Sequence, residues 1–214
     1  MFQFHPRTTI SISGGTGSGK SRLLFRILKQ QKQLFMKPPS KIMYCYGIYQ
    51  ELFEEMEDEL TNITFHQGLP TFEEVKEFTN GSPNTLICID DLMESVVKNT
   101  DIERLFSQGA HHLDTTIVYI NQNLFCQGKH ARTISLNTHY IILLRSPRQA
   151  SQIQYLGRQI MPNNPKAVVE SYEDCMKTPF GYLIINLSPY ANEDERLITR
   201  IFPENGDPIV YIPM

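Results

Sequence analysis

Short apolar runs alternate with amphipathic segments along the whole chain. Runs of β-branched and other apolar residues bounded by turn residues predict strands. The predicted strands are residues 8–13, 41–46, 63–66, 85–89, 116–120, 140–144, 183–187, 197–202 and 209–212. Apolar residues that recur every three or four positions predict helices between them. The predicted helices are residues 19–35, 51–60, 71–78, 101–107, 149–160 and 165–176.

Local signals mark the ends of several predicted helices. Thr71 is a typical N-cap, because its hydroxyl can accept a hydrogen bond from a free backbone N–H of the first turn. Pro38 and Pro39 stop the chain from continuing the first helix, and Gly109 is the expected stop after residues 101–107. These signals support the helix boundaries that the periodicity predicts.

The alternation of strands and helices predicts an α/β fold with a central, mainly parallel sheet flanked by helices on both faces. The mostly apolar runs at 85–89, 116–120 and 140–144 suit central strands that are buried on both sides. The last thirty or so residues are expected to add an antiparallel edge to the same sheet. Since no repeat and no linker-like stretch interrupts the pattern, we expect one domain over residues 1–214.

Composition and charge narrow the setting of this domain. The 214 residues are 41% hydrophobic and 20% charged, and their net charge is −3. This charge argues against coating of nucleic acid by a broad basic surface but allows a local basic track. Four widely spaced cysteines without a CxxC pair indicate a reducing compartment. With no signal region and no stretch near the roughly 20 apolar residues of a membrane span, we expect an intracellular protein that is neither secreted nor bound to a membrane.

A phosphate-binding loop is the strongest chemical signal. The segment between the first predicted strand and helix matches GxxxxGK[ST] in the order Gly14, Gly15, Thr16, Gly17, Ser18, Gly19, Lys20 and Ser21. Glycines let successive backbone N–H groups point inward at phosphate oxygens, and the helix N-terminus adds partial positive charge. Lys20 is expected to reach the β- and γ-phosphates and Ser21 to ligate Mg²⁺. The chain is therefore predicted to be a P-loop nucleoside triphosphatase that uses ATP and Mg²⁺.

Two acidic residues end the predicted strand 85–89. Ligands of open α/β sheets bind at the carboxyl ends of the strands, where Asp90 and Asp91 are expected to lie. We expect Asp90 to hold the Mg²⁺ ion with its water shell and Asp91 to polarise the attacking water. Glu94 is the alternative base, since it follows about one helical turn later.

Amides follow the strand 116–120 in the same way. A polar amide at a strand end can contact both the γ-phosphate and the catalytic water, and so report whether the phosphate is present. Gln122 is the preferred sensor and Asn121 the second choice. An ordinary polar turn after a core strand is the alternative interpretation.

A basic segment at residues 127–132 follows the sensor strand. Arg132, with Lys129, could complete the site of a neighbouring subunit by neutralising charge in the transition state. The alternatives are a contact to nucleic-acid phosphate and a solvated basic loop. Weaker versions of the same idea are Arg145, Arg148 and Arg158. A zinc site formed by His111, His112, Cys126 and His130 is disfavoured, because the first two are adjacent and no second ligand pair has suitable spacing.

The order of these motifs resembles the FtsK/HerA-type genome-packaging ATPases. The likeness runs from about residue 4 to residue 203 and is most specific over residues 121–137, which include Gly128-Lys129-His130-Ala131-Arg132. It is nearest to the packaging ATPases of large DNA viruses with double-jelly-roll capsids, poxviruses among them, and of Polinton-like elements and adintoviruses. The resemblance implies a RecA-like (ASCE) sheet in which the sensor strand lies between the phosphate-loop strand and the Asp strand.

The resemblance also implies a function and its residues. It implies a motor, built as a ring of six or five subunits, that moves double-stranded DNA into a preformed viral capsid. The partners are then DNA and capsid or portal-vertex proteins, in the nucleus or cytoplasm of a host cell. By position, Lys20 and Ser21 match the Walker A residues, Asp90 the Walker B carboxylate and Gln122 the polar sensor. Arg132 falls where a trans-acting arginine is expected, and many relatives carry Glu in place of Asp91.

Other classes of P-loop protein stay open. A superfamily 3 viral helicase also has an Asn after its Asp strand, for which Asn121 is the candidate, but it usually carries a basic hairpin between these strands. Lys98 and Arg104 are the only Lys or Arg in residues 92–114. No NKxD motif supports a GTPase. A small-molecule kinase, or an inert nucleotide fold that binds ATP without turnover, is the remaining alternative.

Overall fold

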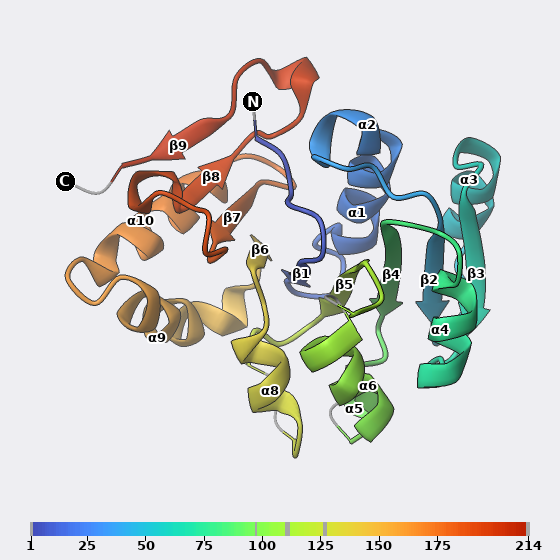
Figure 1. The fold of residues 1–214 in the computed structure, drawn as a ribbon. Coiled ribbons are helices and arrows are strands. Elements are labelled where there is room, and N and C mark those ends of the chain that lie inside the picture. Colours follow the sequence, from blue (N-terminus) through green and yellow to red (C-terminus); the bar gives the residue numbers. More distant parts are fainter. Residues whose placement is uncertain (1, 97, 110–111, 126–127, 213–214) are drawn as a thin grey trace.

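The computed structural model describes residues 2–96, 98–109, 112–125 and 128–212. All strands of this part join one sheet with the order β3-β2-β4-β5-β1-β6-β7-β8-β9 (Figure 1). In chain order the strands are β1 Thr9–Ser13, β2 Ile42–Tyr46, β3 Ile63–Gln67, β4 Thr85–Asp90, β5 Thr115–Asn121, β6 Tyr140–Leu144, β7 Tyr182–Asn186, β8 Leu197–Thr199 and β9 Ile209–Tyr211. The strands from β3 to β6 are parallel, and β7, β8 and β9 continue the sheet antiparallel. Both parts of the predicted sheet are confirmed.

Helices cover both faces of the sheet (Figure 1). They are α1 Lys20–Lys29, α2 Gln31–Leu34, α3 Leu52–Glu59, α4 Phe72–Thr79, α5 Met93–Val96, α6 Thr100–Arg104, α8 Ala131–Leu136, α9 Ala150–Ile160 and α10 Pro165–Cys175. One apolar cluster packs α1, α2 and α3 against one face. Two further clusters lie on the other face, where α4, α6 and α8 cover β2, β4 and β5, while α9 and α10 cover β6, β7 and β8. None of the helices in the described ranges is long and apolar enough to cross a membrane.

The central strands owe their position to their sequence. Every residue of β1, β4, β5 and β6 is buried, as expected for strands with a helical layer on each side. Strand β5 pairs in parallel with both β1 and β4 and therefore lies between them. This is the arrangement that the family resemblance implies, and it brings three loop-bearing strand ends to one edge.

Two predicted helices differ from those observed. The predicted helix 19–35 is divided at Gln30, whose backbone (φ −102°, ψ 25°) leaves the helical range. The break turns α2 so that Leu34 is buried beside Phe4, whose N–H donates to the Leu34 carbonyl at 2.8 Å. The predicted helix 101–107 is α6 followed by a π-helical turn, Leu105–Gly109, which ends at the expected glycine.

Residues 131–136 form a helix, α8, that the sequence pattern does not predict. Only Ile134 of α8 is buried, so the helix is too short to give a clear periodic signal. It is held from outside: the Glu103 carboxylate accepts a hydrogen bond from Thr133 Oγ1 at 3.0 Å and pairs with His130 Nδ1 at 2.7 Å. The His130 contact is the main reason that the pKa of Glu103 is lowered. Tertiary contacts, rather than local propensity, therefore form this helix.

Candidate nucleotide-binding site

The loop between β1 and α1 has the backbone that its glycines predict. Gly17 and Gly19 have φ of 73° and 92°, a range that side chains with a Cβ rarely adopt. The Gly15 N–H donates to the Arg145 carbonyl at 3.2 Å, and the Ser18 N–H donates to the Gly15 carbonyl at 3.1 Å. The loop is therefore curled on itself and anchored to the end of β6. Its last glycine leads directly into α1, so the helix N-terminus adds its partial positive charge to the loop.

The Lys20 ammonium lies against this loop. Its Nζ donates to the carbonyls of Gly14 and Gly15 at 2.9 and 3.0 Å. Burial lowers the pKa of Lys20, and the negative charges of Asp90 and Asp91 oppose this effect. The ammonium is thus held by weak neutral acceptors, which an anionic phosphate oxygen can replace with a stronger charge-assisted contact.

Ser21, Asp90 and Tyr44 meet at one carboxylate oxygen. Ser21 Oγ donates to Asp90 Oδ2 at 2.9 Å, and the Tyr44 hydroxyl donates to the same oxygen at 2.6 Å. Asp90 is only 4% exposed, and this burial raises the pKa of its carboxyl, whereas the two hydroxyl donors lower it. The end of β4 thus lies beside the first turn of α1, across 69 positions of sequence.

These oxygen atoms fit a hard divalent cation. A hydroxyl and a carboxylate are suitable ligands for Mg²⁺, which usually keeps several waters and binds substrate phosphate beside one or two carboxylates. Over the described ranges, no group of three or more His, Cys, Asp or Glu forms a closed metal cage. Ser21 and Asp90 would therefore hold Mg²⁺ together with water and phosphate oxygens. The disfavoured zinc site gains no support. Two of its candidate ligands, His111 and Cys126, lie outside the described residues, and His130 Nδ1 pairs with the Glu103 carboxylate.

Asp91, Gln122 and Thr16 form a second chain of contacts at this edge. Gln122 Nε2 donates to Asp91 Oδ1 at 3.3 Å, and Thr16 Oγ1 donates to Gln122 Oε1 at 3.4 Å. Asn121 instead is buried within the sheet, where its amide donates to Ser11 Oγ at 3.4 Å. Of the two candidate sensors, Gln122 is therefore the one that faces the loop. The side chain of Glu94, the alternative base, lies outside the described residues.

One cleft of about 440 Å³ collects most of these groups. Its lining includes Thr16, Gly17, Gly19, Lys20, Ser21, Asp90, Asp91, Gln122 and Phe180. Gly14 and Gly15 contribute the carbonyls that hold Lys20, and Ser18 is turned inward, so that a Cβ on Gly14 would lie 2.7 Å from its hydroxyl. The residues of the phosphate loop, the Asp strand and the sensor strand therefore surround one space.

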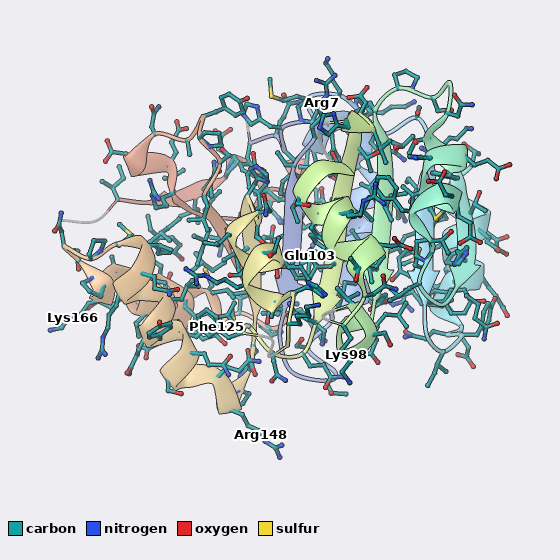
Figure 2. The ribbon with its side chains drawn as sticks, turned by 60° about the horizontal axis from the view of Figure 1, so that its bottom comes forward. Arg7, Lys98, Glu103, Phe125, Arg148 and Lys166 are labelled. Carbon is teal, nitrogen blue, oxygen red and sulfur yellow. The ribbon has the colours of Figure 1, made fainter. Side chains whose placement is uncertain are left out.

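Arg132 does not line this cleft. It lies exposed in the first turn of α8, which packs beside the π-helical turn Leu105–Gly109. Arg148, another basic candidate, extends away from the ribbon into open space (Figure 2). Within the chain, neither arginine completes the phosphate site.

Sequence reasoning missed three residues of the site. In the sequence, Tyr44 is one of the mostly apolar residues of a predicted strand. Its hydroxyl reaches Asp90 only because β2 pairs with β4. Gln149 is buried, and its amide donates to the Gln122 backbone carbonyl from the start of α9. Phe180 lies far along the chain from the loop that it contacts. The hydroxyl of a tyrosine within an otherwise apolar strand was the available signal for Tyr44, whereas no sequence signal pointed to Gln149 or Phe180.

The fold is that of the P-loop nucleoside triphosphatases, with the candidate site at the loop between β1 and α1. Solved structures with the same fold include the genome-packaging NTPase B204 of Sulfolobus turreted icosahedral virus 2 with ATP-gammaS (TM-score 0.57, 14% identity, 97% of this chain and 98% of that chain). A second is the DNA-packaging ATPase B204 of Sulfolobus turreted icosahedral virus (TM-score 0.58, 13% identity, 99% of this chain and 100% of that chain). A third is a KaiC-like protein of Pyrococcus horikoshii OT3 (TM-score 0.51, 10% identity, 96% of this chain and 90% of that chain). At these identities the likeness establishes the fold alone. No protein-family model and no curated protein matches the sequence.

Proposed function

We propose that the protein is an ATP-hydrolysing motor that moves double-stranded DNA, packaging the genome of a virus or virus-like element into a capsid. The observation that carries the nucleotide chemistry is the 2.9 Å contact between Ser21 Oγ and Asp90 Oδ2, beside the Lys20 ammonium. The fold shared with the B204 packaging ATPases and the motif order over residues 121–137 support the motor.

In this proposal each group of the cleft has one task. Loop N–H groups and Lys20 bind and neutralise the β- and γ-phosphates. Ser21 and Asp90 hold Mg²⁺, which draws charge from the phosphate oxygens when it is bound. Asp91 polarises the attacking water, and Gln122, which bonds to both Asp91 and Thr16, orients it. Gln149 keeps the backbone of Gln122 in place from the start of α9.

Arg132 requires a neighbouring subunit to act on phosphate. Since it lies exposed on α8 and outside the cleft of its own chain, we assign it to the site of the next subunit in a ring of six or five. The ring would grip DNA through its phosphates without reading sequence. Its further partners would be capsid or portal-vertex proteins at the site of virion assembly inside a host cell.

The helicase alternative has less support. The described part of residues 92–114 contains α5, α6 and the π-helical turn with short connecting segments, where a superfamily 3 helicase usually carries a basic hairpin. A fork-unwinding assay separates the two functions: a packaging motor hydrolyses ATP on duplex DNA without separating its strands.

The proposed motor function is tested by measuring ATP hydrolysis with and without double-stranded DNA. We expect DNA to stimulate the wild type, and Lys20→Ala to lower turnover by at least about a hundredfold, because charge developing on the phosphates loses its ammonium. Lys32→Ala removes the same charge from the exposed face of α2 and should have no effect. A hydrolysis rate that DNA does not change in an assembled sample contradicts the proposed motor function. A wild-type rate of hydrolysis for Lys20→Ala contradicts the proposed nucleotide site.

A further inference from the structure

A second cleft, of about 340 Å³, adjoins the phosphate cleft. Its walls are the turn at residues 178–181, the Arg26 side of α1, the end of β8 at Arg200, and Asn205. Phe180 is among the residues that line both clefts. The two spaces therefore meet at one aromatic ring.

Phe180 lies on an exposed side of the molecule and has a backbone conformation that is unfavourable for its residue type. The residue is 74% exposed, and its φ of 55° falls in the left-handed region, which bulky residues seldom occupy. The turn that carries it cannot easily relax, because Gly181 lies so near the end of α10 that a Cβ there would be 1.9 Å from the Cys175 carbonyl oxygen. Strained residues that the surrounding structure fixes in this way are concentrated at ligand sites.

The ring is placed at the rim of the phosphate loop. A Cβ on Gly19 would lie 3.0 Å from Phe180 Cδ1, so the ring rests against the loop backbone just before Lys20 and Ser21. A ligand with its phosphates in the loop can thus extend past Gly19 and over the face of Phe180. Its next atoms would enter the second cleft.

The second cleft offers polar groups around one aromatic face. Arg200 and Asn205, whose side chains carry hydrogen-bonding groups, are among its lining residues. Arg26 is already fixed, since its guanidinium pairs with Glu204 at 2.6 Å and lies 3.8 Å from the centre of the Phe202 ring. A flat, heteroaromatic ligand matches this combination, because it can stack on the ring and place its polar edge against the walls.

We propose that this second cleft is the nucleobase subsite and that Phe180 stacks on the base of the bound nucleoside triphosphate. The inference rests on the proposed function, since it requires the triphosphate to occupy the loop. Stacking depends on the face of the base and not on its hydrogen-bonding edge, so Phe180 supplies affinity for any base. The polar residues that line the second cleft would then select among bases through hydrogen bonds to the edge of the base.

A fluorescent probe tests the contact directly. The chain contains no tryptophan, so Phe180→Trp introduces a single reporter at the proposed subsite. We expect ATP with Mg²⁺ to quench its fluorescence and inorganic tripolyphosphate with Mg²⁺ to leave it unchanged. The control is Tyr190→Trp, which replaces an equally exposed ring that stacks on His5, before the start of β1 and far from the loop. Quenching at position 190, or none at position 180 when ATP is bound, overturns the proposal.

Affinity gives a second, independent measurement. Phe180→Ala should weaken ATP binding about tenfold, the loss of one base–aromatic stack, and should leave tripolyphosphate binding unchanged. An unchanged ATP affinity, or an equal loss for both ligands, overturns the base subsite while the phosphate site stands. If the wild type binds neither ligand, the proposed function fails and the subsite fails with it.

Discussion

The carboxylate of Asp90 is almost inaccessible to water although it lies where a divalent cation is proposed to bind. Burial raises the pKa of this group, because the charged form loses hydration. The hydroxyls of Tyr44 and Ser21 act in the opposite direction by donating to one of its oxygens. The free oxygen and the Ser21 hydroxyl are then available to the metal. A single tyrosine on β2 thus helps to keep the Asp90 carboxylate ionised.

We predict that Tyr44→Phe moves the acid limb of the pH–rate profile of ATP hydrolysis to higher pH. Without this hydroxyl the pKa of Asp90 rises further, so more of the carboxyl is protonated at a given pH and fewer molecules can hold Mg²⁺. The measurement is kcat/KM from pH 5 to 8. Tyr140→Phe is the control, since it removes another buried hydroxyl of the same apolar cluster away from Asp90. An acid limb that stays in place would remove Tyr44 from this role.

At the scale of elements, α4 shows how much a local signal can decide. Thr71 and Glu74 form a reciprocal capping box: Glu74 N–H donates to Thr71 Oγ1 at 3.2 Å, and Thr71 N–H donates to the Glu74 carboxylate at 2.7 Å. The expected cap is confirmed. The backbone hydrogen bond from Thr71 is the main cause of the lowered pKa of Glu74.

Thr71→Ala should therefore lower the free energy of unfolding by about 1 kcal/mol, the usual cost of losing an N-cap side chain. Urea denaturation measures this change, with Thr61→Ala, an exposed threonine in the turn after α3, as the control. Because the pKa of Glu74 is lowered on folding, its share of stability is present above its unfolded pKa and is lost as pH falls through the folded value. A Thr71→Ala variant as stable as the control contradicts the role of the cap.

At the scale of the whole molecule, the sheet order decides where the chemistry lies. The strands β1, β4 and β5 are neighbours, so the loop, Asp90 and Gln122 come to one edge from distant parts of the sequence. Arg132 comes to a different surface, on α8. If it takes part in hydrolysis, the site is complete only between two subunits.

Mixing two inactive variants tests this arrangement. Arg132→Ala and Lys20→Ala should each lose turnover, and Arg132→Ala should still bind nucleotide. When they are mixed in equal amounts and allowed to exchange subunits, about a quarter of the sites pair an intact Lys20 with an intact Arg132 from the neighbour. The turnover of the mixture should rise in proportion to this fraction of complete sites. Lys166→Ala, which removes an exposed positive charge from α10, is the control and should stay active alone. A mixture no more active than its components contradicts a role in trans.

The sequence alone determined the strands, most helix boundaries, the α/β class and the identity of the phosphate loop. These features depend on periodicity and on contacts within a few residues, such as Thr71 with Glu74 or the glycines around Lys20. The division of the first helix at Gln30 and the formation of α8 were not predicted, since both arise from contacts with distant segments.

Only the tertiary structure decided which side chains meet. Tyr44 reaches Asp90 because β2 pairs with β4, Gln149 holds Gln122 from the start of α9, and Phe180 rests on Gly19 from the turn before β7. These contacts join residues tens to more than a hundred positions apart, so they depend on strand order and helix packing. Local patterns therefore show that the chain carries a phosphate loop, whereas the packing of the whole chain determines which side chains surround that loop.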